Sequence, residues 1–176
     1  ANWTVTSSAG TNPGNALGLP SAAIGGIGNN GYNAGTVAGA DRALGVYGGA
    51  SGDTKLISAT FTNNTGATVS SFDVNYDLEN WYWRFDAATP RSAGLNMQFV
   101  DGSGTEDMGA AFDGVVTNAG NQVAGGNWLA TPDSDTGLGG TFTPTNPILD
   151  GDTFTLQWNA TVGEPEPLGG GNSRHG

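Results

Sequence analysis

The chain of 176 residues contains no cysteine, few basic side chains and no long apolar run. Without cysteine it can form no disulfide, no thiolate nucleophile and no Cys-ligated zinc site. Only 5 Lys and Arg stand against 16 Asp and Glu, which gives a formal net charge of -11. Such a surface repels phosphate groups and argues against nucleic acid and anionic membranes as partners. No run of about 18 apolar residues occurs, so no transmembrane segment is predicted.

Catalytic side chains are also scarce. A nucleophilic Ser or Thr needs a neighbouring base, and the sole histidine is His175, in a Gly-rich tail. Asp73 and Asp77 would lie about 13 Å apart on one strand face, which is farther than the roughly 5 to 10 Å of glycosidase carboxylate pairs. The sequence therefore predicts that the protein is not an enzyme. A glycan-cleaving enzyme that uses Glu79 is the weakest alternative.

Glycine, threonine and asparagine dominate what is present. The chain has 31 Gly and only 12% charged residues, a balance that disfavours helices and favours short strands joined by turns. Its length suits one domain over residues 1–176. A start at Ala1 without Met fits either a mature exported chain or a truncated one. Low charge with many Thr, Asn and Gly is common in exported bacterial proteins. We therefore expect a secreted or cell-surface protein.

Alternation of apolar and polar residues predicts the strands. The clearest pattern puts Phe72, Val74, Tyr76 and Leu78 on one face of a strand. Predicted strands span residues 2–8, 42–48, 54–62, 68–79, 94–100, 127–130, 140–144 and 153–161.

The strands 54–62 and 68–79 are expected to pair as an antiparallel hairpin. Residues 9–40 are predicted to form a long Gly-rich loop, and residues 162–176 a Gly- and Pro-rich tail. Sheets that each bury one face pack best in pairs. The predicted fold is an all-β, two-sheet antiparallel β-sandwich of jelly-roll type.

The segments "TFTNNTGATVSSFDVNYDLENWYWR" and "LDGDTFTLQW" carry a family resemblance. With "RALG", "GLNMQFV", "NWLATP" and "GGGNSRHG", they resemble exported bacterial β-sandwich modules. Such modules occur in proteins with PEP-CTERM sorting tails and beside lamin-tail or nuclease domains. The resemblance implies an extracellular jelly-roll module without established chemistry. It also implies a further strand after His175-Gly176, either outside these residues or supplied by a neighbouring molecule.

The segment "ENWYWRF" concentrates the aromatics of the chain and is the candidate binding site. If strand alternation continues from Leu78, Trp81 and Trp83 face outward, while Tyr82 and Arg84 face the core. An outward pair of tryptophans is a platform for stacking on sugar rings. The candidate glycan-binding residues are Trp81, Tyr82, Trp83, Arg84 and Glu79. A bulge at residues 79–80 would reverse the alternation and bury the tryptophans.

Two acidic loops are candidate calcium sites, the only cofactor that the sequence suggests. "DSDTG" offers Asp133 and Asp135, and "DGSGTED" offers Asp101 and Asp107. Calcium takes six to eight oxygen ligands, often from such loops. Neither loop matches the complete EF-hand pattern, and Asp-Gly-Ser sequences are also ordinary turns.

Two functions of different classes follow. The first is a structural or adhesive subunit of a cell surface, matrix or filament that self-associates or binds other surface proteins, with strand donation as the route. The second is a carbohydrate-binding module that takes polysaccharide on the aromatic segment around Trp81 and Trp83. The lack of a catalytic set, the Gly- and Thr-rich composition and the strand expected after Gly176 together motivate the first function, which we place slightly ahead of glycan binding.

Overall fold

The computed structural model describes residues 2–7, 31–35, 42–46, 54–85, 91–118, 125–161 and 174–175, with side chains over 56–80, 93–117 and 133–160. This part of the chain is almost entirely β-structure. The strands are β1 (Asn2–Ser7), β2 (Gly31–Gly35), β3 (Arg42–Val46), β4 (Thr54–Thr62), β5 (Phe72–Phe85), β6 (Arg91–Asp101), β7 (Gly104–Asp107), β8 (Gly114–Asn118), β9 (Gly125–Phe142), β10 (Thr153–Thr161) and β11 (Arg174–His175). One short 3-10 helix, η1 (Ala110–Phe112), precedes β8. None of the described helical structure is long and apolar enough to cross a membrane.

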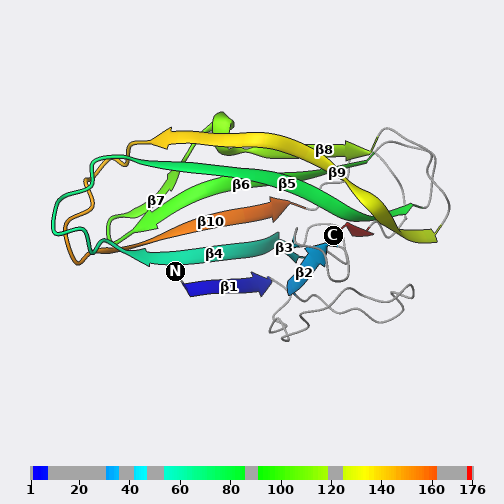
Figure 1. Ribbon diagram of the computed structural model, residues 1–176, viewed down its shortest axis with the longest axis horizontal. Helices are drawn as coiled ribbons and strands as arrows, with labels where there is room; N and C mark the ends of the chain where they lie inside the picture. The colour runs from blue at the N-terminus through cyan, green and yellow to red at the C-terminus, as the bar shows by residue number, and fades with distance from the viewer. Residues whose placement is uncertain are drawn as a thin grey trace.

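Two antiparallel sheets pack face to face (Figure 1). The larger sheet has the order β1-β4-β10-β6-β7, with β8 also paired to β6. The smaller has the order β11-β5-β9, and β2 and β3 form a separate two-stranded sheet. The predicted all-β, two-sheet sandwich is therefore confirmed. Jelly-roll connectivity stays a prediction.

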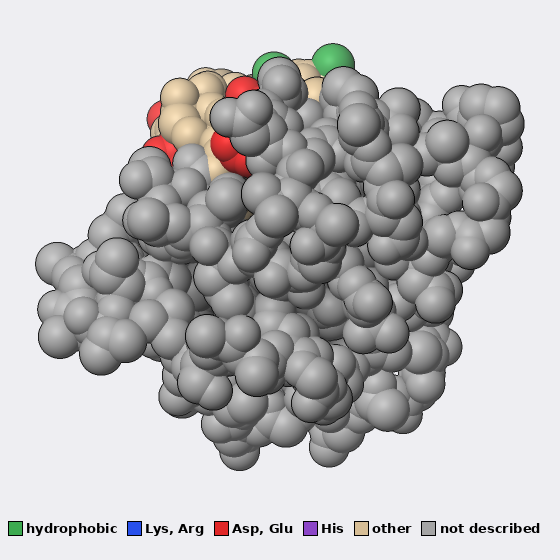
Figure 2. Space-filling model, turned by 90° about the vertical axis from the view of Figure 1, so that its right-hand side faces the viewer, with side chains coloured by type: hydrophobic (Ala, Val, Ile, Leu, Met, Phe, Trp, Pro, Cys, Tyr) green, Lys and Arg blue, Asp and Glu red, His purple; other side chains and the backbone are tan. Residues whose placement is uncertain are grey.

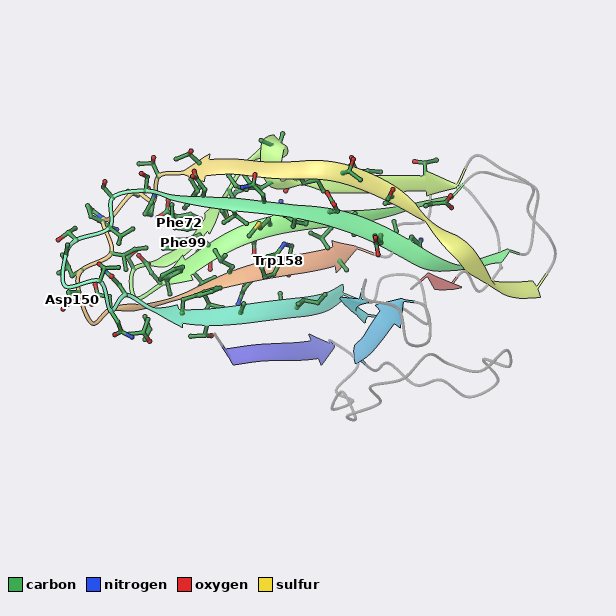
Figure 3. The ribbon with its side chains drawn as sticks, viewed as in Figure 1. Phe72, Phe99, Asp150 and Trp158 are labelled. Carbon is green, nitrogen blue, oxygen red and sulfur yellow. The ribbon has the colours of Figure 1, made fainter. Side chains whose placement is uncertain are left out.

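The core lies between the two sheets, where aromatic rings from both meet (Figure 3). The ring of Phe72 in β5 lies 6.0 Å from that of Phe99 in β6 and 5.3 Å from that of Phe154 in β10. Phe99 and Met97 are fully buried. Burial of one such side chain contributes roughly 1.5 to 3 kcal/mol. Alternation within the predicted strands 94–100 and 153–161 places Leu95, Met97, Phe99, Leu156 and Trp158 on one face of each strand, and all five are buried.

The expected hairpin of 54–62 with 68–79 is wrong. β4 pairs with β1 and β10 in the larger sheet, whereas β5 belongs to the smaller one. Residues between them cross from sheet to sheet and are fixed by the buried Asn63, whose Nδ2 donates to the carbonyls of Ala67 (2.8 Å) and Ile148 (3.0 Å). The bond to Ala67 is local, whereas the bond to Ile148 joins residues 85 positions apart. Together they stabilise a crossover that a local turn pattern cannot distinguish from a hairpin.

The two short strands expected at 127–130 and 140–144 are parts of one strand, β9, which has 18 residues. Its pairing with β5 is irregular, with register shifts between Tyr76 and Leu78 and between Asn80 and Tyr82. At the first shift Gly137 takes a φ of 72°, a region that glycine adopts easily. The polar, Gly-rich sequence there is typical of a turn, but it forms a bulge within a long strand.

Two segments predicted as loops contain strands. Gly31–Gly35 pairs with β3 inside the expected Gly-rich loop, and Arg174–His175 pairs with Arg84 and Trp83 of β5 inside the expected tail. Neither segment alternates between apolar and polar residues. Both are strands because their backbones pair with a neighbouring strand, which a sequence pattern does not reveal. The remainder of both predicted segments, residues 9–30, 36–40, 162–173 and 176, lies outside the described residues.

Candidate functional surfaces

The strand β5 carries the predicted binding residues. Its inward row follows the expected alternation, with Phe72, Val74, Tyr76 and Leu78 half-buried. Asn80 continues this row and is only 3% exposed.

The aromatic segment lies at the end of β5, where Trp83 pairs with Asn127 of β9 and with His175 of β11. Side chains of Trp81, Tyr82, Trp83 and Arg84 lie outside the described residues, as does that of His175. Outward tryptophans therefore stay a prediction.

The bulge that could reverse the tryptophans lies mainly in the partner strand. From Asn80 to Tyr82, β5 advances by two residues, while β9 passes from Asp133 to Trp128, which is five. The extra residues therefore belong to β9. Since reversal requires an extra residue in β5 itself, the register gives no support to a reversal at residues 79–80.

Tyr76 anchors β5 to the segment that precedes β8. Its hydroxyl donates a hydrogen bond to the carbonyl of Phe112, and its ring packs edge-on against Trp158 at 6.1 Å. Burial raises the pKa of Tyr76 to about 12, and the negative charges of Asp113 and Asp135 add to the shift. The phenol is therefore neutral and structural at ordinary pH.

One edge of β5 is open over most of its length in the described part of the chain. A Cβ built on Gly139 would lie 1.9 Å from the carbonyl oxygen of Val74, so that carbonyl points toward β9. Because the N–H and C=O of one residue in an antiparallel strand point to the same side, those of Asp73 and Asn75 point to the other edge. Only β11 pairs there among the described strands, at Trp83 and Arg84.

The outward row of β5 is acidic. Asp73 accepts a hydrogen bond from the Thr141 hydroxyl (2.6 Å), and Asp77 accepts one from the Gly137 amide (2.8 Å). Both aspartates are exposed, and Glu79, which is half-buried, continues the row. The three ranges with described side chains contain no Lys, Arg or His. Described acidic side chains also gather at the top of the end seen in Figure 2.

The four candidate calcium ligands lie in two separate places. Asp133 and Asp135 belong to β9 of the smaller sheet, while Asp101 and Asp107 lie at opposite ends of the β6–β7 hairpin of the larger sheet. Over the ranges with described side chains, no group of three or more His, Cys, Asp or Glu could hold a metal ion. The geometry therefore does not assemble these residues into one ligand set.

Hydrogen bonds to the backbone occupy these carboxylates. Asp101 Oδ1 accepts bonds from Ser103 Oγ (2.6 Å), Ser103 N (2.7 Å) and Gly104 N (3.2 Å), which lower its pKa. Asp107 accepts the Gly109 amide at 2.7 Å, and Asp135 accepts the Val115 amide at 3.0 Å. These carboxylates therefore accept backbone hydrogen bonds that stabilise turns and hold neighbouring segments together.

Comparison with protein-family models, with curated proteins and with solved structures found no match for this chain. The resemblance to exported bacterial modules therefore stays a prediction. Function has to be argued from the surfaces of the chain itself. The open edge of β5 could not be predicted from sequence, since an edge is defined only when strand order is known.

Proposed function

We propose that this protein is a non-catalytic structural or adhesive subunit of an extracellular assembly, and that β5 accepts an extended strand from a neighbouring molecule. The observation that carries this proposal is the edge of β5 from Phe72 to Leu78, along which no described strand pairs on the side away from β9. Unpaired N–H and C=O groups along an edge form a template for another chain.

The inward row of β5 supports strand addition. Phe72, Val74, Tyr76 and Leu78 are each only half-buried, whereas Met97 and Phe99 of the larger sheet are fully buried. A strand added beside β5 would cover the exposed side of this row. Each backbone hydrogen bond formed would contribute roughly 0.5 to 1.5 kcal/mol net. β11 pairs antiparallel with β5 at Trp83, and we expect the incoming strand to run in the same direction.

The acidic outward row of β5 restricts which strand a neighbouring molecule can donate. Antiparallel pairing of two β5 strands about Tyr76 would set Asp73 of one copy opposite Glu79 of the other, and Asn75 opposite Asp77. Like charges placed directly opposite each other destabilise a sheet. The donor is therefore a different segment, with apolar residues toward the core and hydroxyl or basic residues beside the aspartates.

Proline at position 75 tests this proposal. Asn75→Pro removes an N–H that points to the open edge and leaves the ladder with β9 intact, while Asn75→Ala retains that N–H. We expect ordered assemblies from the wild-type protein and from Asn75→Ala in electron microscopy and sedimentation. Asn75→Pro should stay dispersed at a similar melting temperature.

Assembly by Asn75→Pro at the wild-type level would contradict strand acceptance, as would a wild-type protein that stays monomeric at every concentration. Binding on a glycan array by such a monomer would support the carbohydrate-binding alternative. Loss of that binding in a Trp81→Ala, Trp83→Ala variant would assign it to the aromatic segment.

A further inference from the structure

The outer face of the larger sheet is uncharged across its three central strands. Alternate positions along β4 (56 to 62), β10 (153 to 159) and β6 (96 to 100) point away from the core, because the residues between them are core residues. These eleven positions carry hydroxyl, amide or aliphatic side chains and no charge.

Side chains on this face form ladders across the strands. Thr60 and Thr155 share a hydrogen bond between their hydroxyl oxygens at 3.0 Å. Asn159 Nδ2 donates to Gln98 Oε1 at 2.7 Å. Ser58 points outward yet is only 7% exposed. Because neighbouring strands already hold these side chains, a partner that docks here loses little side-chain entropy.

Apolar contact area is present as well. Val115 of β8 is 58% exposed and is one of two exposed large apolar side chains among the described residues. It pairs with Gly94, and the next residue, Val116, is buried on the core side. Val115 therefore lies on the same outer face as the ladders. A partner that covers this face also removes an exposed valine from water.

From these observations we infer that the outer face of the larger sheet stacks on the same face of a second copy. Charge identifies this partner. The outer face of the smaller sheet carries Asp73, Asp77 and Glu79, so two copies that met there would repel each other. The outer face of the larger sheet carries its described carboxylates, Asp107 and Asp113, only at the β7–β8 edge beside Asn96. Two copies that stack about Gln157 therefore place no like charges opposite each other at the centre of the contact.

The area is sufficient for a specific contact. Counted as about seven residues of about 3.3 Å each and spaced about 4.8 Å apart, the three uncharged central strands cover about 330 Å² per copy. With the edge strands β1 and β7–β8 included, the face covers about 550 Å² per copy. The pair would bury about 1,100 Å², which exceeds the roughly 1,000 Å² expected of a biological interface. Stacked sheets pack about 10 Å apart with strands about 30° from parallel. A two-fold axis would make the contact self-complementary.

This inference is independent of strand acceptance, because the face lies on the far side of the larger sheet from β5. The test therefore uses the Asn75→Pro background, in which the edge is blocked. Gln157→Glu places a carboxylate at the centre of the face, and Asn64→Asp makes the same chemical change at an exposed loop residue. Both variants have a net charge one unit more negative.

We expect a reversible monomer–dimer equilibrium in sedimentation equilibrium for Asn75→Pro alone and with Asn64→Asp. Addition of Gln157→Glu should weaken the dimer at least tenfold, since it buries two uncompensated like charges. Equal melting temperatures would show that all variants fold. A monomer at every concentration in the Asn75→Pro background, or a dimer that Gln157→Glu leaves unchanged, would overturn the inference without affecting strand acceptance.

The absence of cysteine permits a second measurement. A single Thr155→Cys substitution would place two thiols near each other across the stacked sheets. A bis-maleimide with a span of about 10 Å, the spacing of stacked sheets, should then trap a covalent dimer. Asn64→Cys, on an exposed loop, is the matched control. Equal cross-linking of both variants would overturn the inference that a second copy covers this face. The same conclusion would follow if the monomer bound an uncharged polysaccharide through this face.

Discussion

At the residue scale, Tyr76 makes the free energy of unfolding depend on pH in the alkaline range. Its pKa is raised from 10.0 to about 12 by burial. Between these values the unfolded chain loses the phenol proton first, so the folded state binds more protons. Stability is therefore full below pH 10 and falls as pH rises through about 12. This dependence belongs to the neutral phenol that donates to Phe112.

Tyr76→Phe should reduce this loss. At pH 8 we expect a decrease of about 1 kcal/mol in the free energy of unfolding, because the Phe112 carbonyl loses its donor. Between pH 8 and pH 11 the variant should lose less stability than the wild type. Urea unfolding at both pH values measures this difference. An equally steep alkaline decline in the variant would assign it to other groups.

The sequence predicted which residues of the clear strands face inward but not the polar residues that connect the sheets. Alternation was sufficient for Met97, Phe99 and Leu156, because one buried face imposes a period of two. Asn63 lies between the two strands that were expected to form a hairpin, and nothing in its local sequence indicates a connecting role. Its role depends on the Ile148 carbonyl, 85 positions away along the chain. A pattern in neighbouring residues cannot predict a contact over that separation.

At the scale of elements, the bulged pairing of β5 with β9 depends on Gly139. This residue has a φ of +117°, and a Cβ there would lie 1.9 Å from the Val74 carbonyl oxygen. Gly139→Ala should therefore reduce the free energy of unfolding by at least about 3 kcal/mol through strain and lost pairing. Chemical denaturation measures this change.

Gly102→Ala is the matched control for this prediction. Gly102 lies in the β6–β7 turn, and a Cβ there would have no atom within 4 Å. We expect its effect to stay within about 0.5 kcal/mol. If the two variants differ by less than about 1 kcal/mol, the strand pair tolerates a side chain at Gly139 and the strain argument is wrong.

Elements with their own apolar alternation were predictable, whereas those defined by a partner were not. The strand 153–161 matches β10 residue for residue. In β9, Gly137 and Gly139 interrupt the alternation, so one strand was predicted as two. The hairpin prediction failed because sequence proximity is a weak guide to pairing when a loop can cross between sheets.

For the whole molecule, the candidate sites were less predictable than the fold. The aromatic segment at Trp81 and Trp83 is conspicuous in the sequence, whereas the edge of β5 and the uncharged face of the larger sheet contain ordinary residues. They become surfaces only through strand order and register. A sequence can therefore predict a sandwich of this kind in detail while giving little indication of which surface contacts a partner.

Net charge sets the conditions under which copies of the molecule associate. At -11, copies repel each other at long range, while the contacts proposed here are made by backbone groups and uncharged side chains. Raising the ionic strength from 0.01 to 0.15 M shortens the Debye length from about 30 to about 8 Å. Self-association should therefore strengthen severalfold with salt, as measured by sedimentation velocity at constant protein concentration. Weaker association at higher salt would mean that ion pairs hold the copies together, and both assembly surfaces would then be wrong.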